Sequence, residues 1–282
     1  MPAMQPALLK QLSKLAFKAH AIKLSVDWQQ PQGEAGKQYP DAFQPSERST
    51  VPDPSKLFVA ASTNKYHTDQ VSTVSGKFEA FIDGVCDAIC NAHNLWKLQA
   101  KFGSIQVMAV SAIGAPGCLT GPDLKPLILM SAPKATPQEL KYSKAVATAV
   151  AKCWKQWQDN VTVPGLPWYP AFAAFPGPQA PPMPNVPVPL ITCPSAMQAE
   201  MTAPRLKQEM IDALGDSNAL HHKELFDGIA QGLATSFLMW LPQQQVSLVM
   251  GKGSIPTFAP PFVPVGPVVA GDVISVPGHL MS

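Results

Sequence analysis

The sequence has little charge. Aspartate, glutamate, lysine and arginine make up 14% of its 282 residues, against about 25% in an ordinary soluble protein. The apolar share of 46% is normal, so the shortage of charge falls on the surface. A surface with few charges is poorly protected against association. We therefore expect other subunits to cover much of it, in a homo- or hetero-oligomer.

Long hydrophobic runs and basic clusters are also missing. No run of about 18 apolar residues occurs, as a membrane span would need, and the N-terminus lacks the apolar core and cleavage site of a secretory signal. The basic residues are lysines plus Arg48 and Arg205, spread without a cluster. The electrostatic footprint of a nucleic-acid binder is therefore absent. We expect a chain made and kept in a cytoplasm, with no nucleic acid and no membrane as partner.

Catalytic signatures are missing too. Neither GxSxG nor HExxH occurs, and the stretch GKGSIP at 251–256 lacks the spacing of a phosphate-binding loop. Asp83 and Asp227 occupy matching places in two similar segments, but Lys144 replaces them in a third, which is typical of a helix-surface residue. We predict no catalytic residue and no cofactor, and hence a protein that is not an enzyme.

Cysteine is scarce, and its number is odd. Five cysteines argue against a secreted disulfide framework. Cys86, Cys90 and His93 share one helix face, but zinc sites usually need two close ligand pairs. A buried face explains the same spacing, so we predict no metal. His221-His222 is interpreted as a solvated helix start. A disulfide between chains stays open for the cysteines that stand one in each later segment, Cys118, Cys153 and Cys193.

Proline is abundant, at 31 residues, and is densest in 168–190. Proline lacks the N–H that helices and sheets need. We therefore predict that 164–190 makes few main-chain hydrogen bonds in its own chain, that any strand there lies at a sheet edge, and that another subunit covers part of it.

Three segments of the sequence resemble one another. Residues 81–96, 142–157 and 225–240 each place apolar residues at helical spacing and end in a tryptophan. An extended arm and a Gly-Pro step follow each segment. This pattern predicts three repeats of a helix and an arm. The expected domains are 1–77 (N-terminal helix and extended segment), 78–135 (repeat 1), 136–195 (repeat 2) and 196–282 (a further helix and repeat 3).

The local signals predict an α+β fold with short hairpins beside each helix. A capping box at Thr136 begins a helix over about 137–158. Thr202 and Gly215 bound a helix at 203–214, and Ser217 is the expected cap of the helix that Pro242 stops. A further helix is expected over 6–24, and strands at 104–110 and 245–250.

Aromatic residues gather around the arm of the second repeat. Such residues serve a core, a subunit interface, the arm of a neighbouring copy or a ligand cleft. Our prediction is an interface that contains the following side chains: Trp154, Trp157, Trp168, Tyr169, Phe172, Phe175, Phe258 and Phe262.

In composition and architecture the chain resembles structural proteins of tailed phages and of phage-tail-like contractile injection particles. The resemblance includes no family motif and transfers no functional residue. It implies a non-enzymatic virion or tail subunit near the baseplate, in a particle assembled in the bacterial cytoplasm. The alternative is a particle-associated hydrolase or a secreted effector carried as cargo.

The arrangement of the three repeats stays open between a ring and a row. A solenoid row requires a nearly constant repeat length, but the successive tryptophans Trp96, Trp157 and Trp240 lie 61 and 83 residues apart. We therefore hypothesise a pseudo-threefold ring, in which one chain matches a threefold or sixfold partner on its axis.

Overall fold

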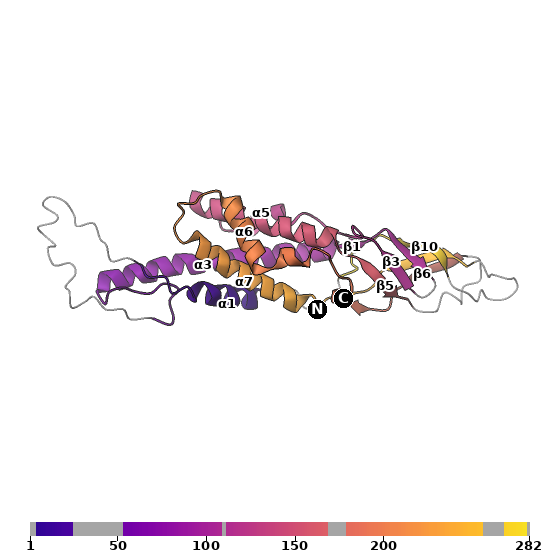
Figure 1. Cartoon of the computed structure of the whole chain (residues 1–282), viewed down its shortest axis with the longest axis horizontal. Helices are drawn as coiled ribbons and strands as arrows, with labels where there is room; N and C mark the ends of the chain where they lie inside the picture. Colours follow the sequence, from indigo (N-terminus) through magenta and orange to yellow (C-terminus); the bar gives the residue numbers. More distant parts are fainter. Residues whose placement is uncertain (1–3, 25–52, 109–110, 169–178, 256–267, 281–282) are drawn as a thin grey trace, which may run out of the picture.

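The protein is an elongated α+β molecule, with helices at one end and strands at the other (Figure 1). The computed structural model describes residues 4–24, 53–108, 111–168, 179–255 and 268–280. The predicted fold class is confirmed. A single cluster of buried apolar side chains runs through the helices and into the sheet.

The helical end contains long and short helices in alternation along the chain. We call the long ones inner helices: α3 (Lys65–Gln99), α5 (Pro137–Asp159) and α7 (His222–Trp240). The short ones are outer helices: α1 (Pro6–Lys18), α4 (Leu124–Ser131) and α6 (Ala203–Leu214). Each outer helix packs between two inner helices, α1 between α3 and α7, α4 between α3 and α5, and α6 between α5 and α7.

Two of the predicted helix boundaries are confirmed by their capping groups. At the start of α5 the Thr136 hydroxyl accepts a hydrogen bond from the Glu139 N–H, and the Glu139 carboxylate accepts one from the Thr136 N–H, each 3.1 Å long. This is the expected capping box. Gly215 ends α6 with φ of +62°, a left-handed conformation that glycine adopts without strain.

Other boundaries were wrong. The Asn64 side chain caps α3 through the Tyr66 N–H, so this helix begins at Lys65 and the expected boundary at 77/78 lies inside it. Helix α1 ends at Lys18 and not at residue 24 as predicted, and the backbone then takes a left-handed φ of +48° at Ala21. For α6 the predicted bounds of 203–214 are confirmed and only the cap is wrong, because the Thr202 hydroxyl donates to the Ala199 carbonyl instead of capping the helix.

Two further differences concern α7 and α4. Helix α7 begins after His221, whose backbone is left-handed with φ of +56°, and not at Ser217. Helix α4 was not expected at all. Its cap is Asp123, whose carboxylate accepts a hydrogen bond from the Lys125 N–H.

Six strands form one antiparallel sheet in the order β5-β3-β2-β10-β9-β6. Their bounds are β2 (Ile105–Met108), β3 (Ser111–Gly114), β5 (Val163–Pro167), β6 (Gln179–Pro184), β9 (Met250–Ser254) and β10 (Val269–Ile274). Two small sheets pair β1 (Lys101–Phe102) with β4 (Leu119–Thr120) and β7 (Val188–Pro189) with β8 (Gln245–Val246). A bridge between Trp168 and Asn185 joins the ends of β5 and β6, so the six-stranded sheet curls until its two edges meet there.

The proline-rich segment supplies these two edge strands. Strands β5 and β6 occupy the first and last places in the strand order, which confirms the predicted edge position. Edge strands tolerate proline because one side needs no ladder donors. The expectation of little main-chain pairing was wrong, however, because β5, β6 and β7 pair with β3, β9 and β8 of the same chain.

Two glycines let α1 approach α7 closely. A Cβ atom on Gly228 would lie 2.8 Å from the Ser13 carbonyl oxygen and 2.9 Å from the Phe17 Cβ. On Gly232 a Cβ would lie 2.1 Å from the Ser13 Oγ. Neither contact leaves room for a methyl group, so glycine is required at both positions of α7.

We therefore expect Gly228→Ala to lower the free energy of unfolding by roughly 1–3 kcal/mol, because the methyl group must push α1 away from α7. The matched control is Gly76→Ala, since a Cβ atom on this exposed residue of α3 would meet nothing within 4 Å. That substitution should raise the free energy by about 0.5–1 kcal/mol, the ordinary gain in helix propensity. Urea denaturation measures both changes, and equal effects of the two substitutions would contradict the close approach.

Candidate functional site

The aromatic residues predicted for an interface fall into two groups. Trp154, Trp157 and Trp168 lie in the chain's own core, with only 1–3% of each residue exposed. They present no surface to another chain in this structure. Of the roles that the sequence left open, these three residues therefore have the role of core residues. The remaining predicted residues lie outside the described ranges: Tyr169, Phe172, Phe175, Phe258 and Phe262.

The ends of the three inner helices meet in one aromatic cluster. The ring centroids of Trp96, Trp157 and Trp240 lie 6.4, 6.4 and 6.3 Å apart. Three residues earlier on each helix stands another ring, and these are His93, Trp154 and Phe237. We call these six side chains the tryptophan cluster. It joins α3, α5 and α7 directly above the strands that follow them.

Each of the three terminal indoles donates a hydrogen bond to a glutamine side chain. Trp96 Nε1 donates to Gln158 Oε1 at 2.6 Å, Trp157 Nε1 to Gln198 Oε1 at 3.0 Å, and Trp240 Nε1 to Gln244 Oε1 at 3.2 Å. These bonds satisfy the one polar atom of each buried indole. The sequence alone does not reveal these glutamines, since only the structure shows which side chain reaches which indole.

His93 is buried inside the cluster. Its ring lies 4.7 Å from that of Trp240 and 5.3 Å from that of Trp154, and neither ring nitrogen has a hydrogen-bond partner in the described part of the chain. Burial, with a smaller contribution from the charge of Lys97, lowers the pKa of His93 to about 3. The imidazole is therefore neutral at neutral pH and serves as one more ring of the core.

The cysteines are packing residues as well. All five lie in the described ranges, and each is a buried free thiol. Burial raises the pKa of Cys86, Cys90 and Cys153 to about 12 and that of Cys118 and Cys193 to about 11. A thiol that remains protonated and inaccessible is a poor nucleophile. No group of three histidine, cysteine or acidic residues within the described ranges is arranged to hold a metal ion.

The two neighbouring histidines at the start of α7 differ from each other. His221 stacks edge-on against Phe58 at 5.4 Å. His222 is only 4% exposed and bonds to the Ala219 carbonyl, so the expectation of a solvated pair was wrong for this residue.

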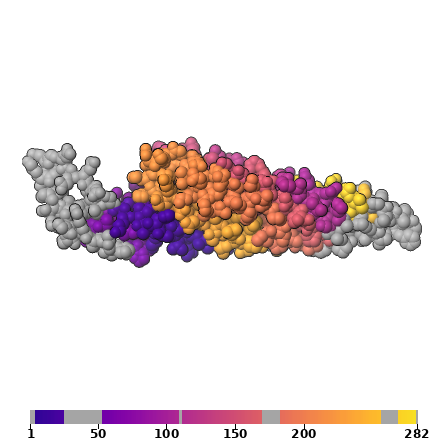
Figure 2. Space-filling view, viewed as in Figure 1, coloured from indigo at the N-terminus to yellow at the C-terminus, as the bar shows by residue number. Residues whose placement is uncertain are grey.

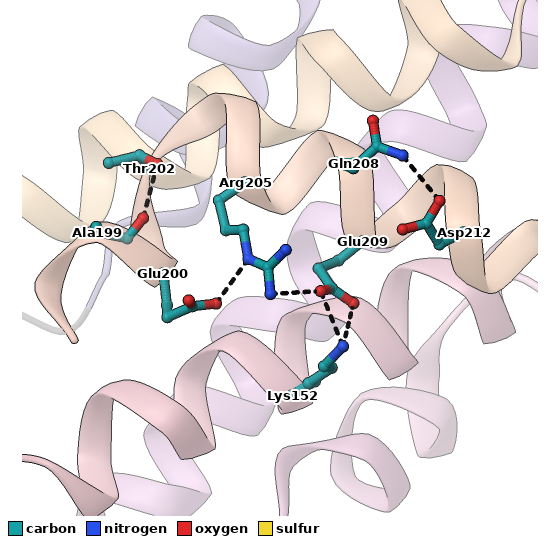
Figure 3. A network of polar contacts seen from close by, with 8 residues as sticks. All are labelled: Lys152, Ala199, Glu200, Thr202, Arg205, Gln208, Glu209 and Asp212. Atoms are coloured by element: carbon teal, nitrogen blue, oxygen red, sulfur yellow. Dashed lines mark hydrogen bonds and ion pairs between the residues drawn. The ribbon is translucent and has the colours of Figure 1, made fainter.

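Charged side chains gather where α6 crosses α5 (Figure 3). The Glu209 carboxylate accepts hydrogen bonds of 2.7 and 2.8 Å from Lys152 of α5, and one of 2.8 Å from Arg205. Arg205 also reaches Glu200, of η4 (Gln198–Met201), at 2.8 Å. Two cations and two carboxylates balance one another, so the network joins α5, α6 and η4 and has no unpaired charge to offer a ligand.

Asp83 and Asp227 occupy matching positions in two of the three similar segments. Each of them forms an ion pair with a lysine. Asp83 of α3 pairs with Lys14 of α1 at 3.0 Å, and Asp227 of α7 pairs with Lys207 of α6 at 2.9 Å. Each therefore ties an inner helix to the outer helix that precedes it in the chain.

His279 fastens the C-terminal segment to the start of the sheet. Its Nδ1 accepts a hydrogen bond from the Phe102 N–H at 2.8 Å, and its carbonyl oxygen accepts one from the Ser247 N–H at 3.0 Å. Burial lowers the pKa of this imidazole to about 4. The sequence alone does not mark this residue, because its partner stands 177 positions away.

The described surface has hollows of different character and exposed apolar side chains. A hollow of about 580 Å³ over β2, β9 and β10 is lined by polar side chains such as Gln106, Lys252 and Asp272 together with apolar ones. Large apolar residues face solvent on the helices and on the sheet, among them Met130, Leu238, Met108, Ile113 and Leu248. A hollow of about 310 Å³ between η4 and α7 is lined chiefly by apolar side chains such as Met201, Phe237 and Leu238. Among the described helices, none combines the length and hydrophobicity that crossing a bilayer requires.

Comparisons with known proteins add no further information. The chain matches no protein-family model, and neither the curated proteins nor the solved structures contain a match.

Proposed function

We propose that the chain is a non-enzymatic structural component of a large protein assembly, of the kind found in phage virions and contractile tails. The observation that carries the proposal is the surface. Large apolar side chains remain exposed on both the helical and the strand end, while charged residues make up 14% of the sequence. A surface of this kind favours association, and contact with neighbouring subunits would cover it.

The chemistry of the interior supports the same proposal. The buried histidine, the thiols and the clustered charges that could serve a reaction are all used to pack or join helices. The tryptophan cluster joins the three inner helices, and the Glu209 network joins α5, α6 and η4, so both hold the helical end together. A firmly joined body with a poorly charged surface suits a part that is held between other subunits.

Sedimentation of the chain in lysates of cells that make it from its own gene tests this proposal. We expect a tagged chain to travel with a large particle and a fixed set of structural proteins. The double variant Leu238→Glu and Met239→Lys should weaken this association, because both side chains are exposed and adjacent on α7. The control is Ser72→Glu with Thr73→Lys, which adds the same two charges at adjacent exposed polar residues of α3 and removes no apolar surface. A wild-type chain that sediments as a monomer in such lysates would refute the proposal.

A further inference from the structure

We infer that this chain is the single-chain equivalent of a trimer, with three units in a ring around the long axis of the molecule, and that its partner is a coaxial protein assembly with threefold symmetry. The statement about the partner rests on the proposed function, whereas the ring does not. Each unit contains an outer helix, an inner helix and two strands in that order. Unit 1 is α1, α3, β2 and β3, unit 2 is α4, α5, β5 and β6, and unit 3 is α6, α7, β9 and β10.

The strand order of the sheet repeats around this ring. The first strand of each unit pairs with the second strand of the preceding unit: β5 with β3, β9 with β6, and β2 with β10. All three pairings are antiparallel. The pairing of β2 with β10 joins unit 1 to unit 3, which a row of stacked units could not do because its first and last members do not touch.

The outer helices follow the same cyclic rule. Each packs against the inner helix of its own unit and that of the preceding unit, so α4 also touches α3, α6 touches α5, and α1 touches α7. The last of these contacts again closes the ring. Figure 2 shows the N-terminal segment in indigo beside the orange surface of α6 and α7.

Glycine occupies matching places in two of these contacts. Gly84 and Gly228 each stand twelve residues before the terminal tryptophan of their helix. A Cβ atom on Gly84 would lie 2.6 Å from Pro133, in the link between α4 and α5, while Gly228 faces α1. In both cases the following unit approaches the inner helix at the same position. Unit 2 has Ala145 there.

The interior side chains also agree in position. The nearly equal distances of 6.4, 6.4 and 6.3 Å between the terminal tryptophans describe an equilateral triangle around an axis. Further along the helices, the rings of Phe81 and Tyr142 lie 6.1 Å apart and those of Tyr142 and Phe226 lie 5.7 Å apart. Phe81 and Tyr142 stand fifteen residues before their terminal tryptophans and Phe226 stands fourteen, so the middle of α3 meets the beginnings of α5 and α7 at nearly the same level, and the three helices run parallel.

The arms of units 1 and 3 also share an unusual backbone conformation at matching positions. Ser104 and Leu248, each eight residues after a terminal tryptophan, both adopt a left-handed backbone with φ of +52° and +56°. This backbone conformation is uncommon for residues other than glycine, asparagine and aspartate. The preceding residues, Gly103 and Ser247, donate their N–H groups to the segment that follows the second strand of their unit. Unit 2 departs here, with Pro164 and Gly165.

The threefold symmetry of the partner is inferred from the ring of three units. A body with three similar sides presents three similar surfaces, one on each side of its axis. A partner with threefold symmetry can bind all three at once, and linked contacts strengthen one another. A single asymmetric partner would use only one side and gain nothing from the ring.

The ring is tested in the isolated chain by rotating one layer of the tryptophan cluster. The triple variant His93→Trp, Trp154→Phe and Phe237→His moves each ring to the preceding unit and keeps the layer's composition. If the three positions are equivalent, the ratio of folded to unfolded protein should fall by no more than about tenfold. The control exchanges two side chains along a single helix, with Ile89→His and His93→Ile. It also keeps the composition but puts imidazole in a different layer, and we expect a loss of more than about a hundredfold.

A rotated variant as damaged as the control would overturn the ring. The partner is tested by electron cryomicroscopy of the isolated assembly, reconstructed without imposed symmetry. We expect the chain on a threefold axis with each unit against one copy of the same partner. A chain that lies off the axis and touches one copy would overturn the inference about the partner and leave the proposed function standing. Absence of the chain from any particle would refute the proposed function, while the layer rotation would still decide the ring.

Discussion

Replacing Trp157 with alanine is expected to lower the free energy of unfolding by about 3–5 kcal/mol, the range for truncating a large buried aromatic side chain. Trp157 is 1% exposed and its ring contacts those of Trp96, Trp154 and Phe237. Its removal also leaves the Gln198 side chain without the indole donor. The loss therefore combines a cavity with a broken, partly buried hydrogen bond.

Urea denaturation followed by circular dichroism measures this effect. Tyr66→Ala is the matched control, because this aromatic residue is 76% exposed at the start of α3 and its truncation should change the free energy by less than about 0.5 kcal/mol. If the two substitutions cost the same, the tryptophan cluster is not the centre of the core. In the ring we infer, Trp96→Ala and Trp240→Ala should each cost about as much as Trp157→Ala.

Mild acid is expected to destabilise the protein through two buried histidines. The pKa of His93 is about 3 and that of His279 about 4 in the folded protein, against 6.5 for an exposed imidazole. The unfolded chain therefore binds protons below pH 6.5 that the folded chain does not. The stability that the two neutral imidazoles contribute is fully present above pH 6.5, and it is lost as the pH falls toward their pKa values in the folded protein. Between pH 7 and pH 5 each histidine should remove roughly 2 kcal/mol.

The contribution of His93 can be separated by substitution. His93→Leu and His93→Gln both remove the titrating ring, so each should lose the part of the pH dependence that His93 contributes in this range. The two variants should differ in stability at pH 7, because glutamine leaves a polar group unpaired in the cluster and leucine does not. Unfolding curves at pH 7, 6 and 5 measure this. A pH dependence that persists unchanged in both variants would show that His93 is not buried as a neutral ring.

Local features of the sequence predict the local features of the fold. The capping box at Thr136, the glycine at 215 and the closing tryptophans carry their signals within a few residues, and the structure places helix ends close to them. Proline in 164–184 correctly indicates edge strands, because the missing N–H groups exclude a central position. Helix α4 escaped detection since its eight residues hold few polar positions to mark a periodic pattern.

Contacts between distant residues could not be predicted. The pairing of β2 with β10, the bond from Phe102 to His279 and the reach of Gln158 to Trp96 depend on how three segments meet in space. The same limit explains why core tryptophans were predicted to lie in a subunit interface. An apolar aromatic residue in a sequence is equally suited to a core and to a subunit contact, and only the packing of α3, α5 and α7 assigns Trp154 and Trp157 to the core.

The pairing of β2 with β10 also affects the order in which the chain folds. Residues 105–108 are made well before their partner in the sheet, which stands at 269–274. Until that strand emerges, β2 presents an open hydrogen-bonding edge and α1 lacks the glycine face of α7. Open edges of this kind promote aggregation, and contacts of such long sequence separation form slowly. From the synthesis of β2 until that of β10 the sheet therefore remains incomplete, and a chaperone that shields its open edge in this interval would favour correct folding.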